Sequence, residues 1–180
     1  MPFRFERRKV KITKEEFVEL LTYWLSMPMS KGSIAIFAQN IGFNIGSKKN
    51  IDRLTEKLFM LYMWVIVRAC DRLIDDAGTR NSCLDIFHRT IYSYRSDATD
   101  EGFRQWMLVI GSKYLNYDKA MEKTEEPGPL WWLARLVNKN IFGKVKEDPF
   151  VQTYIGANIS SFTEYVESYL SEALKKSDIE

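Results

Sequence analysis

The sequence is poor in the side chains that most often perform metal or nucleophilic chemistry. It contains one histidine, His88, and two cysteines, Cys70 and Cys83. These three residues do not fill a four-ligand zinc site, and we expect both thiols to be reduced and partly buried. His88 follows Cys83 by five residues, a spacing that points the two side chains in different directions on a helix. We therefore expect no catalytic role for His88, and we place it at or near a helix surface.

The chain also lacks a strong net charge. Its 26 Lys and Arg residues and 24 Asp and Glu residues leave a formal charge of +2, so no overall field draws it to nucleic acid and specific DNA binding is not expected. No GxGxxG or P-loop motif is present. The charge is uneven only in the first segment, MPFRFERRKVKITK. Its basic residues include Arg4, Arg7, Arg8, Lys9 and Lys11. This arm either contacts phosphates of RNA or lipid headgroups, or is a solvated terminus.

No hydrophobic run is long enough to cross a bilayer. The longest, LFMLYMWVIV at residues 58–67, has ten residues, whereas a spanning helix needs about 20. Because this run is apolar on every side of a helix, it is typical of a helix surrounded by others. No apolar segment follows the basic start, so we expect no secretory signal. A mitochondrial transit peptide stays open as an alternative, although the arm lacks serine.

Apolar residues recur at intervals of three and four along most of the chain, which predicts helices. The residues that predict helix starts are Thr13, Ser47, Ser82, Thr99 and Asp148. No alternating pattern predicts a sheet. We therefore expect an all-α fold with a basic arm over residues 1–12 and one compact domain over residues 13–176. That domain would hold six or seven helices around a central apolar helix at about residues 48–76.

Three aspartates at the end of the central helix suit a metal site. Asp71 and Asp75 are four residues apart and share a helix face, with Asp76 beside them. Carboxylates in this arrangement bind Mg²⁺ together with a diphosphate. The segment RACDRLIDD resembles the first aspartate-rich motif of squalene and phytoene synthases, which implies a Mg²⁺-dependent prenyl-diphosphate enzyme or its relic. The alternative is that the aspartates pair with Arg68 and Arg72 of the same helix in solvent.

A longer part of the chain resembles a different family. LFMLYMWVIVR, residues 58–68, is similar to the helix of the ubiquinol–cytochrome c chaperone family in which a Trp precedes an Arg by four residues, here Trp64 and Arg68. YLNYDKAM, residues 114–121, resembles the Tyr-x-x-Ala segment of that family at Tyr117 and Ala120. An Asn-x-aromatic-Gly sequence follows at Asn140. The order and spacing of these segments carry the resemblance over about residues 55–172.

The resemblance implies an assembly factor for respiratory complex III, without a cofactor, rather than an enzyme. Such proteins act on newly made cytochrome b, with a small helical partner and near the ribosome exit. The implied location is the mitochondrial matrix or the periphery of the inner membrane, or the cytoplasm of a bacterium. Peripheral membrane contact through the basic arm stays open. The residues expected to bind the client or partner are Trp64, Arg68, Tyr114, Tyr117, Trp131, Trp132, Asn140 and Phe142.

Two neighbouring tryptophans are candidate anchors for a client. Trp131 and Trp132 point about 100° apart on a helix, so we expect one of them to face outward. The alternative is that both pack between helices. Aromatic and methionine side chains adapt to an apolar client helix. The sequence thus favours a binding protein, and a helical scaffold or ribosome-associated protein without such a client is the remaining alternative.

Overall fold

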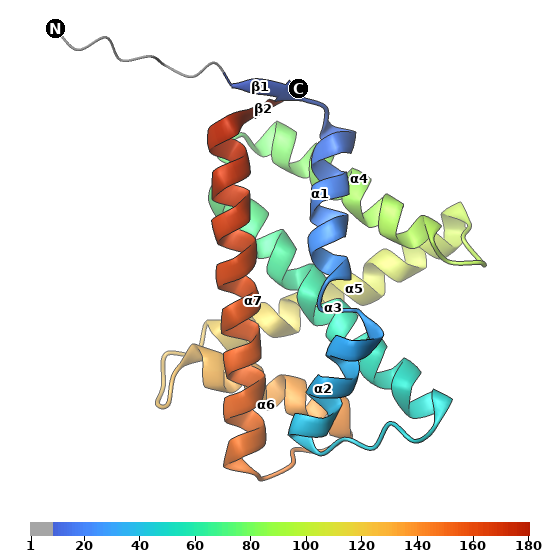
Figure 1. The fold of residues 1–180 in the computed structure, drawn as a ribbon, viewed down its shortest axis with the longest axis vertical. Helices are drawn as coiled ribbons and strands as arrows, with labels where there is room; N and C mark the ends of the chain where they lie inside the picture. The colour runs from blue at the N-terminus through green and yellow to red at the C-terminus, as the bar shows by residue number, and fades with distance from the viewer. Residues whose placement is uncertain (1–8) are drawn as a thin grey trace, which may run out of the picture.

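The computed structural model describes residues 9–180, so Arg4, Arg7 and Arg8 lie outside the described residues. Within this range the chain forms seven helices and a pair of short strands (Figure 1), which confirms the all-α expectation. The helices are α1 (Lys14–Ser26), α2 (Lys31–Ile41), α3 (Lys48–Leu73), α4 (Ala77–Ser93), α5 (Asp100–Met121), α6 (Pro129–Phe142) and α7 (Pro149–Lys176). The strands are β1 (Val10–Ile12) and β2 (Ser177–Ile179).

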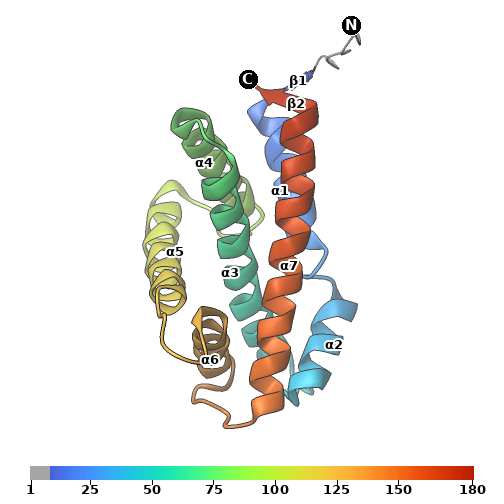
Figure 2. The same ribbon diagram turned by 90° about the vertical axis from the view of Figure 1, so that its left-hand side faces the viewer.

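Helix α3 is the centre of the fold. Residues 60–66 are all at most 8% exposed, although they span every side of the helix. The other six helices all contact α3, and Figure 2 shows it between α5 and α7. The prediction of an enclosed apolar helix is confirmed, and the helix ends at Leu73. None of the helices in the described range is long and apolar enough to cross a membrane.

The predicted start signals are confirmed at four helices and wrong at one. Thr13, Ser47, Thr99 and Asp148 cap α1, α3, α5 and α7. Helix α4 begins at Ala77 rather than near Ser82, because the side chain of Asp76 accepts a 2.6 Å hydrogen bond from the backbone N–H of Thr79. An aspartate considered as a metal ligand is therefore a helix cap.

The strand pair was not predicted by the sequence. β1 and β2 run parallel, with Val10 opposite Ser177 and Ile12 opposite Ile179. Three residues are too few to display an alternating pattern. In the described part of the basic arm, Lys9 lies 3.1 Å from Asp178, and Lys11 pairs with Glu180. The last residues of the chain thus offset these two positive charges.

His88 is buried between α4 and α5, so its predicted surface location is wrong. Its Nδ1 lies 2.7 Å from the carbonyl oxygen of Leu84, and its Nε2 lies 3.3 Å from the hydroxyl of Tyr114. The rings of Phe87 and Trp106 pack against it. The local helix pattern missed this position because α5 supplies the covering aromatics. Burial lowers the pKa of His88.

We expect His88 to make the free energy of unfolding depend on pH. The pKa of His88 in the folded protein lies below its unfolded value of 6.5. The His88 side chain therefore binds a proton more readily in the unfolded chain. The contribution of neutral His88 to the free energy of unfolding should therefore be fully present above pH 6.5. As the pH falls below 6.5, the free energy of unfolding should decrease by at most about 1.4 kcal/mol per pH unit. Urea denaturation at pH values between about 5.5 and 7.5 measures this slope. His88→Gln should flatten the slope, and an equally steep slope in that variant would contradict the burial.

Candidate functional site

Trp64 and Arg68 of α3 share one acceptor on α5. The Nε1–H of Trp64 donates to Oδ1 of Asp118 at 3.0 Å, and Nη1 of Arg68 donates to the same oxygen at 2.9 Å. The guanidinium carbon of Arg68 lies 5.3 Å from the centroid of the Trp64 ring. Trp64 is buried, whereas the side chain of Arg68 is 39% exposed. These three residues form the Trp64–Arg68–Asp118 cluster, which extends from the buried ring of Trp64 to the partly exposed side chains of Arg68 and Asp118.

Residues from α5 and α6 extend this cluster. The ring of Tyr117 packs edge-on against Trp64, with 5.5 Å between centroids. Burial raises the pKa of Tyr117 to about 12, and the nearby side chain of Asn140 of α6 acts in the opposite direction. Ala120 is buried close by, one turn further along α5. Segments that lie far apart in the sequence therefore meet where α3, α5 and α6 pack together.

Most of the predicted client-binding side chains hold helices together. Trp64 and Tyr117 are buried. Tyr114 is half-buried with its hydroxyl at His88, and burial raises its pKa. Phe142 packs against Phe43, with 5.6 Å between ring centroids. A direct role of these residues in client binding stays a prediction, and it would have to act through their partly exposed edges.

Trp131 and Trp132 are both half-buried. Trp132 packs against the core, and its Nε1–H donates to the carbonyl of Glu125 at 3.3 Å. Trp131 stands edge-on to Trp132, with 4.7 Å between centroids and a 90° angle. Arg135 lies over its ring at 5.4 Å. Trp131 is the better candidate for an outward anchor, because only Trp132 is packed against the core.

The three aspartates of the alternative metal site do not converge. Asp71 lies 3.3 Å from Arg80 of α4, Asp76 caps α4, and Asp75 is exposed. Burial raises the pKa of Asp71, and the charge of Arg80 partly opposes this shift. Within residues 9–180 no three side chains of the His, Cys, Asp or Glu type gather as a metal site. Both cysteines are buried and free.

The predicted ion pairs within the central helix are wrong. Arg68 pairs with Asp118 of α5 and not with Asp71. Arg72 pairs with Glu167 of α7, at 2.6 Å, and not with Asp75 or Asp76. The partners differ because α5 and α7 pack around this end of α3 and bring acidic side chains closer than the neighbours in the same helix.

A groove opens beside the cluster, between α3, α6 and α7, with a volume of about 220 Å³. Its apolar lining residues are Trp64, Val65, Met121, Leu130, Leu133 and Ile159. Its polar and charged lining residues are Arg68, Arg72, Ser160, Thr163, Glu164 and Glu167. The contribution of α7 to this groove was not predicted from the sequence, although the small polar residues Ser160 and Thr163, on either side of the core residue Phe162, were a signal for it.

No family model matches the chain, and searches of the curated proteins and of the solved structures found no match. The resemblance to the chaperone family therefore depends on the order and spacing of the segments named above. The groove beside Trp64 and Arg68 is the candidate functional site, because apolar and charged side chains line it together.

Substitution of Asp118 tests whether the cluster fastens α5 to α3. Asp118→Ala leaves the buried Nε1–H of Trp64 without an acceptor, a loss that typically costs about 1–3 kcal/mol. Asp118→Asn keeps an acceptor oxygen, so we expect a smaller loss. Asp85→Ala removes an exposed carboxylate of α4 and serves as the matched control. Urea denaturation measures the free energy of unfolding of the wild type and the three variants. If Asp118→Ala loses no more free energy of unfolding than Asp85→Ala does, the role of the cluster is contradicted.

Proposed function

We propose that the protein is a non-enzymatic binding protein that receives an apolar side chain of a client helix in the groove between α3, α6 and α7. The observation that carries this proposal is the lining of the groove. Six apolar side chains face it, and they include an aromatic ring at Trp64 and a flexible thioether at Met121. Methionine and aromatic side chains adapt to different partners, and an apolar groove between helices is a common site for an amphipathic helix.

The size of the groove favours a side chain over a whole cofactor or substrate. Its volume of about 220 Å³ is below the range of about 300–1,000 Å³ that is typical of small-molecule sites. A groove of this size accommodates one or two apolar side chains. It therefore suits an anchor residue that projects from a helix lying across the surface.

Charged residues define the edges of the site. Arg72 of α3 pairs with Glu167 of α7 at 2.6 Å, and Arg68 is held by Asp118. Because these pairs tie α3 to α7 and to α5, they help to fix the width of the groove. The partly exposed arginines also offer hydrogen-bond donors to polar groups of a client at the edge of the apolar surface.

The resemblance to the ubiquinol–cytochrome c chaperone family supports a specific client. We propose newly made cytochrome b as that client and assembly of respiratory complex III as the process, with a small helical partner and the ribosome or membrane nearby. Lys9 and Lys11 face Asp178 and Glu180. Contact of the arm with phosphates would therefore depend mainly on Arg4, Arg7 and Arg8.

Filling the groove should abolish client binding without unfolding the protein. Ser160 is half-buried and lines the groove, so a phenyl ring at Ser160→Phe would occupy the space of the client side chain. Ser161→Phe introduces the same ring at an exposed neighbouring position outside the lining. We expect Ser160→Phe to lower the recovery of cytochrome b by at least about tenfold and Ser161→Phe to leave it unchanged. Affinity purification of the tagged protein from cells that assemble complex III measures this.

Two outcomes of this experiment would contradict the proposal. If the folded wild-type protein recovers no complex III precursor, cytochrome b is not the client. If both variants recover as much cytochrome b as the wild type, the groove is not where the client binds. Recovery of ribosomes without cytochrome b would instead favour the helical ribosome-associated protein.

A further inference from the structure

A second concave site lies between α5 and α6 and is lined with positive charge. Its lining residues from α5 and the turn that follows are Asn116, Lys119, Ala120 and Lys123, and those from α6 are Trp132, Arg135, Leu136 and Lys139. On α5, Lys119 and Ala120 follow Asn116 by three and four residues, and on α6 the spacings from Trp132 are three, four and seven. Each set therefore lies on one face of its helix, and Lys123 follows just after α5 ends. The two faces form a cleft, and Val145 from the following loop also lines it.

Two contacts show how the helices place these faces together. The Nζ of Lys123, beyond the end of α5, lies 4.1 Å from the ring of Trp132 near the start of α6. Tyr117, earlier in α5, lies near the side chain of Asn140 close to the end of α6. The helices therefore lie side by side in opposite directions, and the charged faces run along the same cleft. Its volume is about 360 Å³, within the range of small-molecule sites.

Among residues 9–180, only one of the four basic side chains that line the cleft forms a salt bridge. Arg135 forms two hydrogen bonds with Glu147, at 2.8 and 3.0 Å. In contrast, no carboxylate oxygen of residues 9–180 forms a salt bridge with Lys119, Lys123 or Lys139. Three ammonium groups thus line one small cleft.

We propose that the α5–α6 cleft binds a phosphate-bearing ligand, carried by a small molecule or by a lipid headgroup. A phosphate monoester has a charge near −2 and three acceptor oxygens, which matches several ammonium groups along one cleft better than a single carboxylate does. Lysine ammonium groups bind phosphate as point charges. The apolar part of the lining, Ala120, Leu136 and the ring of Trp132, accommodates the organic part of the ligand.

The cleft is separate from the groove between α3, α6 and α7, which is the proposed client site. Leu130 and Leu133 of α6 line the groove, whereas Trp132, Leu136 and Lys139 line the cleft. Phosphate binding therefore neither requires nor follows from client binding, and each can fail alone. A variant of the cleft should still recover cytochrome b if the proposed function holds.

The test uses the full chain and two probes. Calorimetric titration with inorganic pyrophosphate measures binding of a free phosphate compound. Flotation with vesicles of phosphatidylglycerol and phosphatidylcholine in equal amounts measures binding of a lipid headgroup. We expect at least one probe to bind, with an affinity that falls as salt is added. Lys119→Gln/Lys139→Gln should weaken that binding by at least about tenfold.

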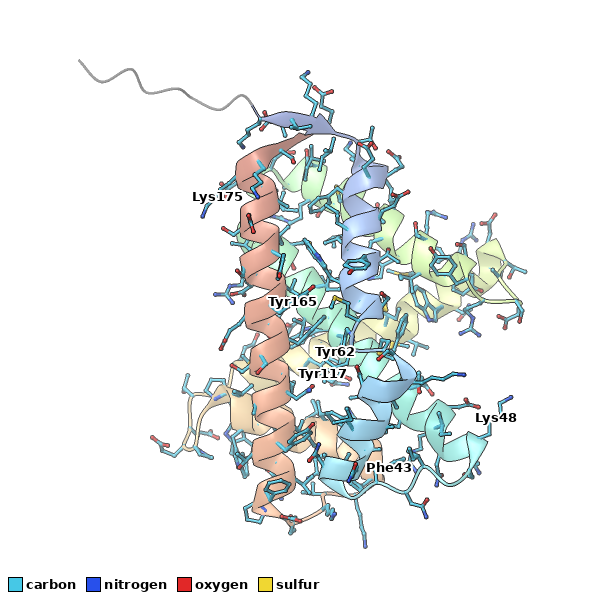
Figure 3. All side chains as sticks on the ribbon, in the orientation of Figure 1. Phe43, Lys48, Tyr62, Tyr117, Tyr165 and Lys175 are labelled. Atoms are coloured by element: carbon cyan, nitrogen blue, oxygen red, sulfur yellow. The ribbon has the colours of Figure 1, made fainter. Side chains whose placement is uncertain are left out.

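The matched control is Lys48→Gln/Lys49→Gln, which removes two exposed charges at the start of α3. Figure 3 shows Lys48 at a corner of the molecule, well away from Tyr117 of α5. The control should bind as the wild type does. Circular dichroism verifies folding, and the single variants Lys119→Gln and Lys139→Gln replace the double variant if it is unfolded.

The outcomes separate the sources of the phosphate. Binding of pyrophosphate supports a small molecule as the ligand, and binding of vesicles alone supports a lipid headgroup. In either case the Lys119→Gln/Lys139→Gln variant must lose the binding. The proposal is overturned if neither probe binds, if the control loses binding to the same extent, or if only an RNA oligonucleotide binds.

Discussion

Burial of seven consecutive residues of α3, from position 60 to 66, is the constraint on which the rest of the structure depends. Each large apolar side chain in this run contributes about 1.5–3 kcal/mol only if it is removed from water. Since the run covers every side of the helix, neighbours are needed all around it, and the other six helices supply them. The groove between α3, α6 and α7, which we propose as the client site, lies where this enclosure ends, near Arg68 and Arg72.

The Trp64–Arg68–Asp118 cluster marks that transition from interior to surface. A single carboxylate oxygen satisfies a buried indole N–H and a partly exposed guanidinium. Leaving the indole without an acceptor would be costly, which explains why an acidic residue from α5 is needed at this point. The Trp and Arg landmarks of the sequence therefore have a structural role beside the groove, and the groove itself uses additional residues from α6 and α7.

The sequence predicted those features of the fold that depend on residues close together in the chain. The caps at Thr13 and Thr99 and the enclosed character of α3 follow from the neighbouring sequence alone. The burial of His88, the partners of the arginines and the strand pair depend on contacts between distant segments, which one sequence does not reveal. Asp76 shows how the two kinds of signal compete, because the same carboxylate suits a metal ligand and a helix cap. Only its position before α4 decides between them.

Photo-crosslinking from position 160 tests the central claim most directly. A photoreactive side chain in place of Ser160 would point into the groove, and one in place of Ser161 would lie outside it. In cells that are assembling complex III, the groove position should crosslink to a membrane-spanning helix of newly made cytochrome b, and the neighbouring position should not. Equal crosslinking from both positions, or none from either, would contradict a client groove between α3, α6 and α7.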